Sequence, residues 1–369
     1  MITKKRREPY GESMKFVHLA DMHFDSPFVT LSDKGNLGEQ RRIEQRKILK
    51  KVIEYIKLNN IEYLFISGDL YEHQHIRKST IEYINNLFKE IPSTKIFISP
   101  GNHDPYLKKS YYTTFNWNEN VYIFGPQIEK IELEDVDIYG FGFNDFYCSD
   151  SNIENLKLDN PEKINILVIH GTLDGATTID MQYNPMSATT LKQKEFNYIA
   201  LGHIHKNNFN ANSNIIYPGS TISLGFDELG EHGMVAGEIN STGNKLEFVK
   251  LDETEFVELE LNCTEINSTE ELIEKINDLE IQENKLYKII LTGKRNFEIN
   301  IYNLYKYELN QRIIKIKNKT KPNYNLEEIS NENTLKGLFA KEILEEIKNK
   351  NYNEEIIEQA LEIGMEILE

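Results

Sequence analysis

The sequence predicts an α/β fold built as a four-layer α/β/β/α sandwich, in which two β-sheets pack face to face between layers of helices. In the first part of the chain, short apolar runs of strand length alternate with amphipathic helical segments, as expected for parallel strands joined by helices. From residue 121 onward the apolar runs shorten and helices become scarce, which indicates a second sheet stacked on the first. Five of the predicted strands end in polar tips, where α/β proteins bind ligands.

The first sheet is predicted from a βαβαβ pattern, which implies parallel strands and right-handed crossovers. Its strands and helices are expected at residues 16–20, 39–58, 63–67, 81–88 and 96–98. The second sheet, partly antiparallel near its end, is expected from strands at residues 121–124, 136–142, 164–170, 198–202, 215–217, 233–240 and 245–250. Because parallel strands end at the same edge of a sheet, the polar tips are expected to lie close together.

Domain boundaries are expected where this pattern changes. Residues 1–13 are expected to be an unstructured leader, and residues 14–250 hold all of the polar tips. Residues 251–325 carry the strand and helix signals of a small α+β domain of their own. Residues 326–369 predict a helical hairpin of two amphipathic, Glu-rich helices, whose apolar faces exceed what the pair can bury against itself.

Composition excludes several classes of protein. No apolar run approaches the ~18 residues that a membrane helix needs, and no apolar signal segment opens the chain, so no membrane association is expected. The cysteines, Cys148 and Cys263, supply neither a disulfide framework nor a thiolate zinc site, which makes a reducing cytoplasm the expected compartment. The formal net charge of −17 argues against a surface that wraps nucleic acid throughout, although a local basic track fits it.

The polar tips indicate a metal site. They are Asp21 and His23, Asp69 after Gly68, Asn102, His103 and Asp104 after Gly101, His170 before Gly171, and the pair His203 and His205. Carboxylate, imidazole and amide ligands without thiolates suit manganese, magnesium, iron or zinc, and this set is too large for one ion. Two ions ~3.5–4 Å apart that share a bridging carboxylate can clamp a phosphate and activate a water. Asp69, alone at its tip, is the candidate bridge.

Other polar residues near these tips have a structural interpretation. His18 lies inside the first strand and is expected to be a satisfied core histidine. His73, His75 and His232 are expected on the surface or in loops rather than as ligands. For Glu72, a contact with the metal ligands and a solvated turn position fit equally well.

In this order, the motifs Asp-x-His, Gly-Asp, Gly-Asn-His-Asp, His-Gly and Gly-His-x-His resemble those of the calcineurin-like metallophosphoesterase superfamily. The resemblance covers residues 14–250, and the motifs are highly specific as a set. Two further stretches, HLADMHFDSPF at residues 18–28 and YPGS at residues 217–220, are similar to the SbcD-type DNA repair exonucleases, nearest to their YhaO-like branch. The resemblance implies that residues 251–325 form a capping domain and that the terminal helices grip a coiled-coil ATPase.

The resemblance also implies a role for each tip residue. One metal would be held by Asp21, His23, Asp69 and His205, and the other by Asp69, Asn102, His170 and His203. His103 would meet the scissile phosphate and protonate the departing oxygen, with Asp104 orienting its ring. Nucleases of this family often place His or Asp three residues after the bridging Asp, where this chain has Glu72.

The activity implied by the resemblance is that of a dimetal-dependent DNA phosphodiesterase, a 3′-to-5′ exonuclease with single-strand endonuclease activity in DNA repair. Two divalent ions are the expected cofactors, Mn²⁺ first, with Mg²⁺, Fe or Zn²⁺ as alternatives. DNA ends and an SbcC-like coiled-coil ATPase are the expected partners, and a homodimer is compatible with the resemblance. Two alternatives stay open: a small-molecule phosphodiesterase or phosphatase with a closed pocket, and a weakly active platform for an ATPase.

Basic residues near the tips suggest a path for DNA. Lys108 and Lys109 follow the His103 loop by a few residues and are the preferred candidates. A second cluster, on the first helix, fits a solvated face better, because Glu39 and Glu44 lie among its bases. It comprises Arg41, Arg42, Arg46, Lys47, Lys50 and Lys51.

Overall fold

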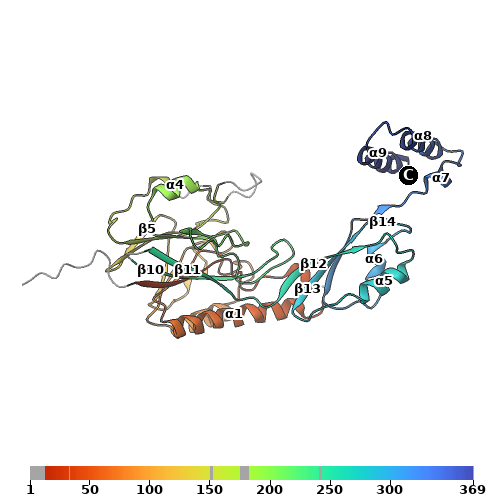
Figure 1. Cartoon of the computed structure of the whole chain (residues 1–369). Coiled ribbons are helices and arrows are strands. Elements are labelled where there is room, and N and C mark those ends of the chain that lie inside the picture. Colours follow the sequence, from red (N-terminus) through yellow and green to blue (C-terminus); the bar gives the residue numbers. More distant parts are fainter. Residues whose placement is uncertain (1–12, 33, 150–152, 175–182, 241–242, 369) are drawn as a thin grey trace, which may run out of the picture. The chain divides into compact units, whose positions relative to one another are not determined.

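The computed structural model describes residues 13–32, 34–149, 153–174, 183–240 and 243–368. The chain divides into two compact units, Met1–Phe256 and Val257–Glu369, which are described separately (Figure 1). Apart from Ser13, the predicted leader lies outside the described residues. Among the residues that are described, none of the helices has the length and apolar character needed to cross a membrane.

The first unit contains a six-stranded sheet of order β11-β10-β1-β2-β3-β4. Its strands are β1 (Met14–Leu19), β2 (Tyr63–Ile66), β3 (Lys95–Ile98), β4 (Val121–Ile123), β10 (Gly233–Asn240) and β11 (Gly243–Lys250). β1 to β4 run parallel, with Val17 paired to Leu64 and Leu64 to Ile96. Helices α1 (Leu37–Asn59) and α2 (Lys78–Lys89) make the two crossovers, so the predicted βαβαβ arrangement is confirmed.

Three strands predicted for the second sheet belong to the first sheet instead. β4 pairs with β3, and β10 and β11 add two antiparallel strands beyond β1. β1 lies inside the sheet, so the backbone groups on its outer edge need a partner. β10 supplies it along a register from Met14↔Ile239 to His18↔Val235. The prediction that β4, β10 and β11 belong to the second sheet is therefore wrong. The apolar pattern of a strand indicates how deeply the strand is buried and does not indicate which strand it pairs with.

The second sheet has the order β5-β6-β7-β8-β9. Its strands are β5 (Glu129–Glu132), β6 (Val136–Phe141), β7 (Ile164–His170), β8 (Tyr198–Gly202) and β9 (Ile215–Ile216). β6 to β9 run parallel, whereas β5 is antiparallel to β6. β5 was not expected from the sequence, because its charged residues lack an apolar run. Charged residues on an edge strand discourage pairing with other chains.

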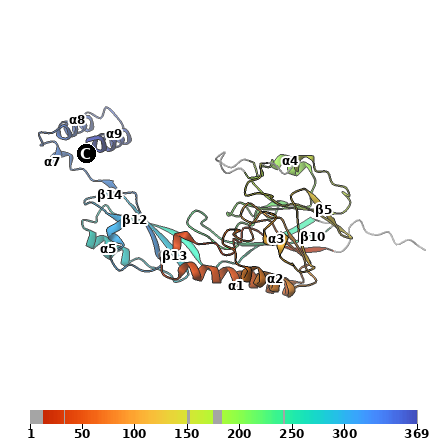
Figure 2. The ribbon, with the colours of Figure 1, turned by 180° about the vertical axis from the view of Figure 1, so that it is seen from behind.

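Alternation along the strands sorts apolar side chains of the first unit into three cores. Val17 and Leu19 of β1 pack with α1 and α2, whereas Phe16 joins the core between the two sheets. A third core covers the far face of the second sheet with α4 (Ala188–Gln193). Figure 2 shows α1 and α2 next to each other on this unit. Full burial of one such aliphatic or aromatic side chain contributes about 1.5–3 kcal/mol, and the predicted mixed α/β class is confirmed.

Short helices complete the first unit. They are α3 (Tyr111–Thr114) and the single 3-10 turns Val29–Leu31 and Ile153–Asn155. α3 follows the His103 loop, and its residue Tyr112 is buried and donates a hydrogen bond to Asp104. This short helix therefore anchors the loop that carries three of the polar tip residues.

The second unit contains a three-stranded sheet, β12-β13-β15, and a two-stranded ribbon, β14-β16. The strands are β12 (Glu255–Asn262), β13 (Lys285–Thr292), β14 (Lys294–Arg295), β15 (Ile313–Asn318) and β16 (Lys321–Pro322). Helix α5 (Thr269–Asn277) packs on the sheet through Leu272 and Ile276, and α6 (Ile301–Leu304) through Leu304. The side chain of Ser268 accepts a hydrogen bond from the Glu271 N–H, which fixes the start of α5.

The unit ends in α7 (Leu326–Ile329), α8 (Leu335–Asn349) and α9 (Glu354–Leu368). Thr334 caps α8 by accepting a 3.0 Å hydrogen bond from Gly337 N. α8 and α9 pack closely where Phe339 meets Gly364, since a Cβ on Gly364 would lie 2.1 Å from the Phe339 ring. The two predicted amphipathic helices are therefore present. The division of this unit at residue 325 stays a prediction.

Candidate metal centre

The polar tips of both sheets meet at one edge of the first unit. Asp21 and Asp69 follow β1 and β2 of the first sheet, whereas His170 ends β7 of the second sheet. The ligating atoms of these three residues lie within 4.8 Å of one another. Those of Asp21, His23 and His205 form a second such group. The candidate site therefore takes carboxylates and imidazoles from both sheets and from opposite ends of the unit's sequence.

The backbone at these tips adopts conformations that side chains rarely favour. Asp21, His23 and Asp69 have φ values of 50°, 47° and 51°, in the left-handed region. Two backbone hydrogen bonds hold these turns together, from Asp21 N to Gly68 O (3.1 Å) and from His23 N to Asp69 O (2.9 Å). Strained backbone of this kind concentrates at functional sites, where the surrounding structure maintains it.

Two glycines leave room for the candidate ligands. A Cβ on Gly68 would lie 2.3 Å from Nδ1 of His170, and a Cβ on Gly101 would lie 2.3 Å from Oδ1 of Asp69. Any other residue at either position would displace a candidate ligand. The glycines that precede Asp69 and Asn102 in the sequence are therefore part of the site.

In three of the candidate histidines, an acceptor fixes the Nδ1 atom. Nδ1 lies 2.7 Å from Glu72 Oε1 in His23, 2.8 Å from the Ser67 carbonyl in His170, and 2.6 Å from Glu228 Oε2 in His205. A carbonyl or ionised carboxylate only accepts, so Nδ1 must donate and Nε2 turns its lone pair toward the site. An imidazole prepared in this way is the usual metal ligand.

The Nε2 atoms of His23 and His205 face each other at 3.0 Å. Two nitrogen lone pairs at that distance repel each other unless a proton or a cation lies near both. The Nε2 atom of His170 likewise lies 3.0 Å from Asn102 Oδ1 and 3.3 Å from Asp69 Oδ2. The donor set therefore fits divalent cations bound by nitrogen and oxygen.

Asp69 lies between the two groups. Its Oδ2 atom is 3.3 Å from His170 Nε2 and 3.8 Å from His23 Nε2, while Oδ1 accepts a 2.8 Å hydrogen bond from His103 N. Burial disfavours its charged form, but the His170, His23 and His103 imidazoles outweigh burial and hold the pKa of Asp69 well below its usual range. A buried carboxylate that stays ionised between two groups of ligands has the position required of a bridge.

Asn102 and His203 lie beside His170. The His203 ring centroid is 5.2 Å from that of His170, and His203 N donates 3.1 Å hydrogen bonds to both carboxylate oxygens of Asp21. The structure thus brings all seven predicted ligands to one region of the unit. Their division between two ions stays a prediction.

His103 lies at the exposed side of the cluster, and its side chain is 44% exposed. Its Nδ1 atom is 3.0 Å from Oε2 of Glu72, the same carboxylate that holds His23. Burial would lower the pKa of His103, but the hydrogen bond to Glu72 and the Asp69 charge raise it to about 9. Of the two roles left open for Glu72, the structure supports contact with the site.

The prediction that Asp104 orients the His103 ring is wrong in this structure. The Asp104 carboxylate is fully buried and accepts hydrogen bonds from three backbone N–H groups, of Asp69 (3.0 Å), Leu70 (2.7 Å) and Gly101 (2.7 Å). It also accepts a 2.5 Å hydrogen bond from the Tyr112 hydroxyl. Burial and the charge of Asp69 raise the pKa of Asp104 to about 7. Asp104 therefore ties the turns after β2 and β3 together, and Glu72 holds the ring.

Two other histidines are structural. His18 is fully buried with Nδ1 2.9 Å from the Tyr198 hydroxyl and Nε2 3.1 Å from Ser67 Oγ, so its predicted core role is confirmed. Burial lowers its pKa to about 3. His232 is buried as well, with Nδ1 2.8 Å from Ser220 Oγ and Nε2 2.7 Å from the Glu228 carbonyl. It lies in a loop, which is one of the two predicted positions, but the loop folds inward against residues 220–228, so the side chain is buried and not on the surface.

The basic residues separate into two groups. Lys108 and Lys109 are exposed just after the His103 loop. On α1, Arg41 is buried against Asp252, and Arg46 pairs with Asp25 at 2.9 Å. These two arginines stabilise the fold, and the remaining bases of α1 are half-buried or exposed.

An α/β unit that gathers carboxylates and imidazoles at the strand ends of two sheets is typical of metal-dependent phosphoesterases. The sequence profile of the calcineurin-like phosphoesterases matches residues 14–207, more than half of the chain. The chain therefore belongs to the calcineurin-like phosphoesterase family. That family uses a dimetal centre, for which the described residues include candidate ligands.

Two curated relatives align with most of the chain. The "uncharacterized metallophosphoesterase YhaO" of Bacillus subtilis is 24% identical over 279 residues, which cover 72% of this chain and 67% of that protein. The D subunit of the nuclease SbcCD from Staphylococcus epidermidis is 29% identical over 253 residues, which cover 59% of this chain and 64% of that protein. The chain thus spans about two thirds of the length of these relatives.

Solved structures give weaker matches. A purple acid phosphatase from yellow lupin, PPD1, aligns with 66% of this chain and 52% of its own at 13% identity and a TM-score of 0.42. GAP50, an inner-membrane-complex anchor of Plasmodium, aligns with 65% of this chain and 85% of its own at 12% identity and a TM-score of 0.37.

Proposed function

We propose that this chain is a dimetal-dependent DNA phosphodiesterase that acts in DNA repair as a 3′-to-5′ exonuclease with single-strand endonuclease activity. The observation that carries the metal-dependent part is the pair of Nε2 atoms of His23 and His205, 3.0 Å apart, with both Nδ1 atoms held by glutamates. The step to DNA is supported by the relative that is named as part of a nuclease. It is also supported by the exposed Lys108 and Lys109 beside the site.

The proposed ligands divide between two ions, with Mn²⁺ as the first candidate. Asp21, His23, Asp69 and His205 hold one ion, and Asp69, Asn102, His170 and His203 hold the other. Such a pair of ions polarises a bound phosphate and supplies a nucleophilic water. The chain contributes ligands that are held by hydrogen bonds, such as those from His23 Nδ1 to Glu72 and from His205 Nδ1 to Glu228.

His103 is the proposed general acid. Its ring packs edge-on against His23, with 4.7 Å between the centroids, and projects to the exposed side of the cluster. Because Glu72 holds Nδ1, the Nε2 atom is the one that delivers a proton to the departing oxygen. Glu72 fixes the tautomer and the direction of that proton.

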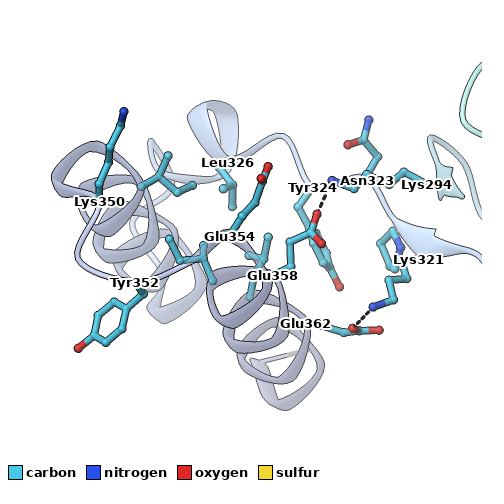
Figure 3. Close-up of a pocket in the computed structure, with 14 residues that line it drawn as sticks. Lys294, Lys321, Asn323, Tyr324, Leu326, Lys350, Tyr352, Glu354, Glu358 and Glu362 are labelled. Carbon is cyan, nitrogen blue, oxygen red and sulfur yellow. Dashed lines mark hydrogen bonds and ion pairs between the residues drawn. The ribbon is translucent and has the colours of Figure 1, made fainter.

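The C-terminal helices are proposed to dock on an SbcC-like coiled-coil ATPase. Leu335, Leu338 and Ile363 are exposed by 73%, 61% and 59%, so apolar surface remains on both α8 and α9. A cavity of about 540 Å³ lies where α9 meets the β14-β16 ribbon, with Ile347, Ile357 and Leu361 among its lining residues (Figure 3). The relative that is named as one part of the nuclease SbcCD supports a partner for this surface.

Ion pairs hold the cavity in place. Lys294 lies 3.1 Å from Glu358, and Lys321 lies 2.7 Å from Glu362, both between the ribbon and α9 (Figure 3). The hairpin therefore contacts the β14-β16 ribbon on one side and presents apolar side chains elsewhere. Packing of the hairpin back on the small domain, which these ion pairs support, is the alternative to a partner helix.

A substrate panel tests the proposed activity. The purified chain with Mn²⁺ is given end-labelled duplex DNA, end-labelled single-stranded DNA and a chromogenic phosphodiester. We expect metal-dependent cleavage of both DNAs, with release of nucleotides from 3′ ends. Cleavage of the small diester with neither DNA cleaved would overturn the nuclease assignment and favour a small-molecule phosphodiesterase.

A further inference from the structure

Glu228 is a buried carboxylate outside the residues matched by the family profile, which end at residue 207. The side chain is only 8% exposed. One oxygen lies 2.6 Å from His205 Nδ1 and accepts a 3.2 Å hydrogen bond from Ser220 Oγ, while the other accepts from Leu224 N. A buried carboxylate with three donors is held in one position, because any movement would leave part of its charge unpaired.

Residues 220–228, here called the strap, hold Glu228 in place. At its start, Ser220 N donates to the His205 carbonyl (2.9 Å), so the strap begins against the residue that Glu228 contacts. In its middle, Ser223 N donates to Asp252 Oδ2 (2.9 Å), and Ser223 O accepts from Arg41 (2.8 Å). Arg41 and Asp252 are buried and form a 2.7 Å ion pair. The strap therefore cannot move without breaking buried polar contacts.

The strap fixes the tautomer of the His205 imidazole through Glu228. A carboxylate only accepts, so Nδ1 of His205 must donate to Glu228, and the lone pair of Nε2 points at His23 Nε2, 3.0 Å away. We propose that Glu228 is the positioning residue of His205, which holds this imidazole in the tautomer and orientation needed to bind a divalent cation. The inference rests on the proposed role of His205 as a metal ligand.

A glutamine at this position cannot do the same. Its single oxygen serves either His205 or Leu224 N, and its amide group then faces the other donor. If the amide faces His205, the imidazole must carry its proton on Nε2, which cannot then bind a metal. If the amide faces Leu224, two N–H groups oppose each other. In the first case the imidazole loses its metal-binding tautomer, and in the second the opposed N–H groups of residue 228 and Leu224 displace the side chain that orients the ring.

The test is a calorimetric titration of Mn²⁺ into the full chain after chelation of its metals. We expect two binding events in the unmodified protein. Loss of a carboxylate that orients a ligating histidine typically costs ~10–100-fold in metal affinity. Glu228→Gln should weaken one event by that factor and leave the other event and the melting temperature of the metal-free protein unchanged. Glu228→Asp keeps the charge on a side chain one methylene shorter. Its Mn²⁺ affinity in the weakened event should lie between those of the unmodified protein and of Glu228→Gln.

The matched control is Glu231→Gln, which removes the same charge three residues further on. Its side chain is 64% exposed and lies 3.7 Å from Lys250, so both binding events should stay unchanged. His205→Ala tests the assignment on which the inference rests, and should weaken the event that Glu228→Gln weakens. If His205→Ala leaves both events intact, the ligand assignment fails, and the inference fails with it.

Other results would overturn the role proposed for Glu228 and leave the assignment of His205 as a ligand intact. If His205→Ala weakens one event and Glu228→Gln weakens none, Glu228 does not position the imidazole. If Glu228→Gln lowers the melting temperature of the metal-free protein while both events keep their affinities, or if it prevents folding, the carboxylate serves only the strap. Equal weakening by Glu231→Gln would show that charge alone is responsible.

Discussion

Glu72 and His103 are joined by a 3.0 Å hydrogen bond between Oε2 and Nδ1, and the other oxygen of Glu72 lies 2.7 Å from His23 Nδ1. One carboxylate therefore holds both a proposed metal ligand and the proposed general acid. Any movement of Glu72 would disturb binding and chemistry together.

Replacement of His103 and of Glu72 should separate these two functions. His103→Asn should keep two Mn²⁺ per chain and lower turnover of a small diester by ~10²–10⁴, because a general acid is lost and the ligands are not. Glu72→Gln should lower turnover and also weaken Mn²⁺ binding, because the single oxygen of a glutamine cannot accept from both His23 and His103. Calorimetry and steady-state rates measure both effects. Loss of metal from the His103→Asn protein would show that His103 is a ligand.

Neutralisation of Lys108 and Lys109 tests the path of DNA. The double variant Lys108→Gln/Lys109→Gln should weaken DNA binding for all sequences alike, because phosphate contacts carry no sequence information. The slope of log K against log salt should flatten by ~0.9 for each duplex phosphate that the variant no longer neutralises. The matched control is Lys47→Gln/Lys50→Gln on α1. An unchanged slope in the first variant, with a flatter slope in the control, would move the path to α1.

Removal of the C-terminal helices should separate catalysis from partner binding. A chain truncated after Ser330 should fold, bind two Mn²⁺ and cleave a small diester normally, yet fail to co-purify with an SbcC-like ATPase. In the full chain, Leu338→Glu should weaken that complex roughly tenfold or more, since buried apolar contacts dominate such interfaces. Asn349→Glu adds the same side chain at an exposed polar position of α8 and should have little effect. Undiminished binding by the truncated chain would refute the docking role of these helices.

The buried histidine in β1 predicts a dependence of stability on pH. The pKa of His18 is lowered from 6.5 to about 3, so between these values the unfolded chain binds a proton that the folded chain does not. The free energy of unfolding should therefore fall by ~1.4 kcal/mol per pH unit from this residue as the pH drops from 6.5 toward 3. Denaturant titrations of the metal-free protein at a series of pH values give the free energy of unfolding at each pH. For His18→Gln, this free energy should fall less steeply as the pH drops. Identical slopes would mean that His18 is accessible to protons when folded.

The strands and most of the tip residues could be predicted because each is a local signal. The run at residues 96–98 is apolar, and a glycine at residue 101 follows shortly after it, directly before the polar residues 102–104. Nothing beyond neighbouring residues is needed to recognise it. The meeting of Asp21 with Asp69 and Asn102 was also accessible, since these residues follow parallel strands of one sheet, whose ends lie at a common edge.

The strand pairing and the side-chain contacts that were not predicted depend on residues far apart in the chain, which sequence spacing does not reveal. Strand β10 has the apolar pattern of either sheet, and only the open edge of β1 assigns it to the first. Asp104 follows His103 directly, yet its carboxylate turns inward to backbone N–H groups while Glu72, 31 residues away, reaches the ring. Glu228 gave no signal apart from its place eight residues after the YPGS stretch.

The dimetal centre bridged by Asp69 is the central claim, and its most direct test is the number of metal ions bound per chain. Mn²⁺ is measured by elemental analysis after reconstitution, in the unmodified protein and in Asp69→Ala. Because one carboxylate serves both ions, we expect two Mn²⁺ per chain in the first and none in the second. A single ion in the unmodified protein, or a full complement in Asp69→Ala, would contradict the bridged centre.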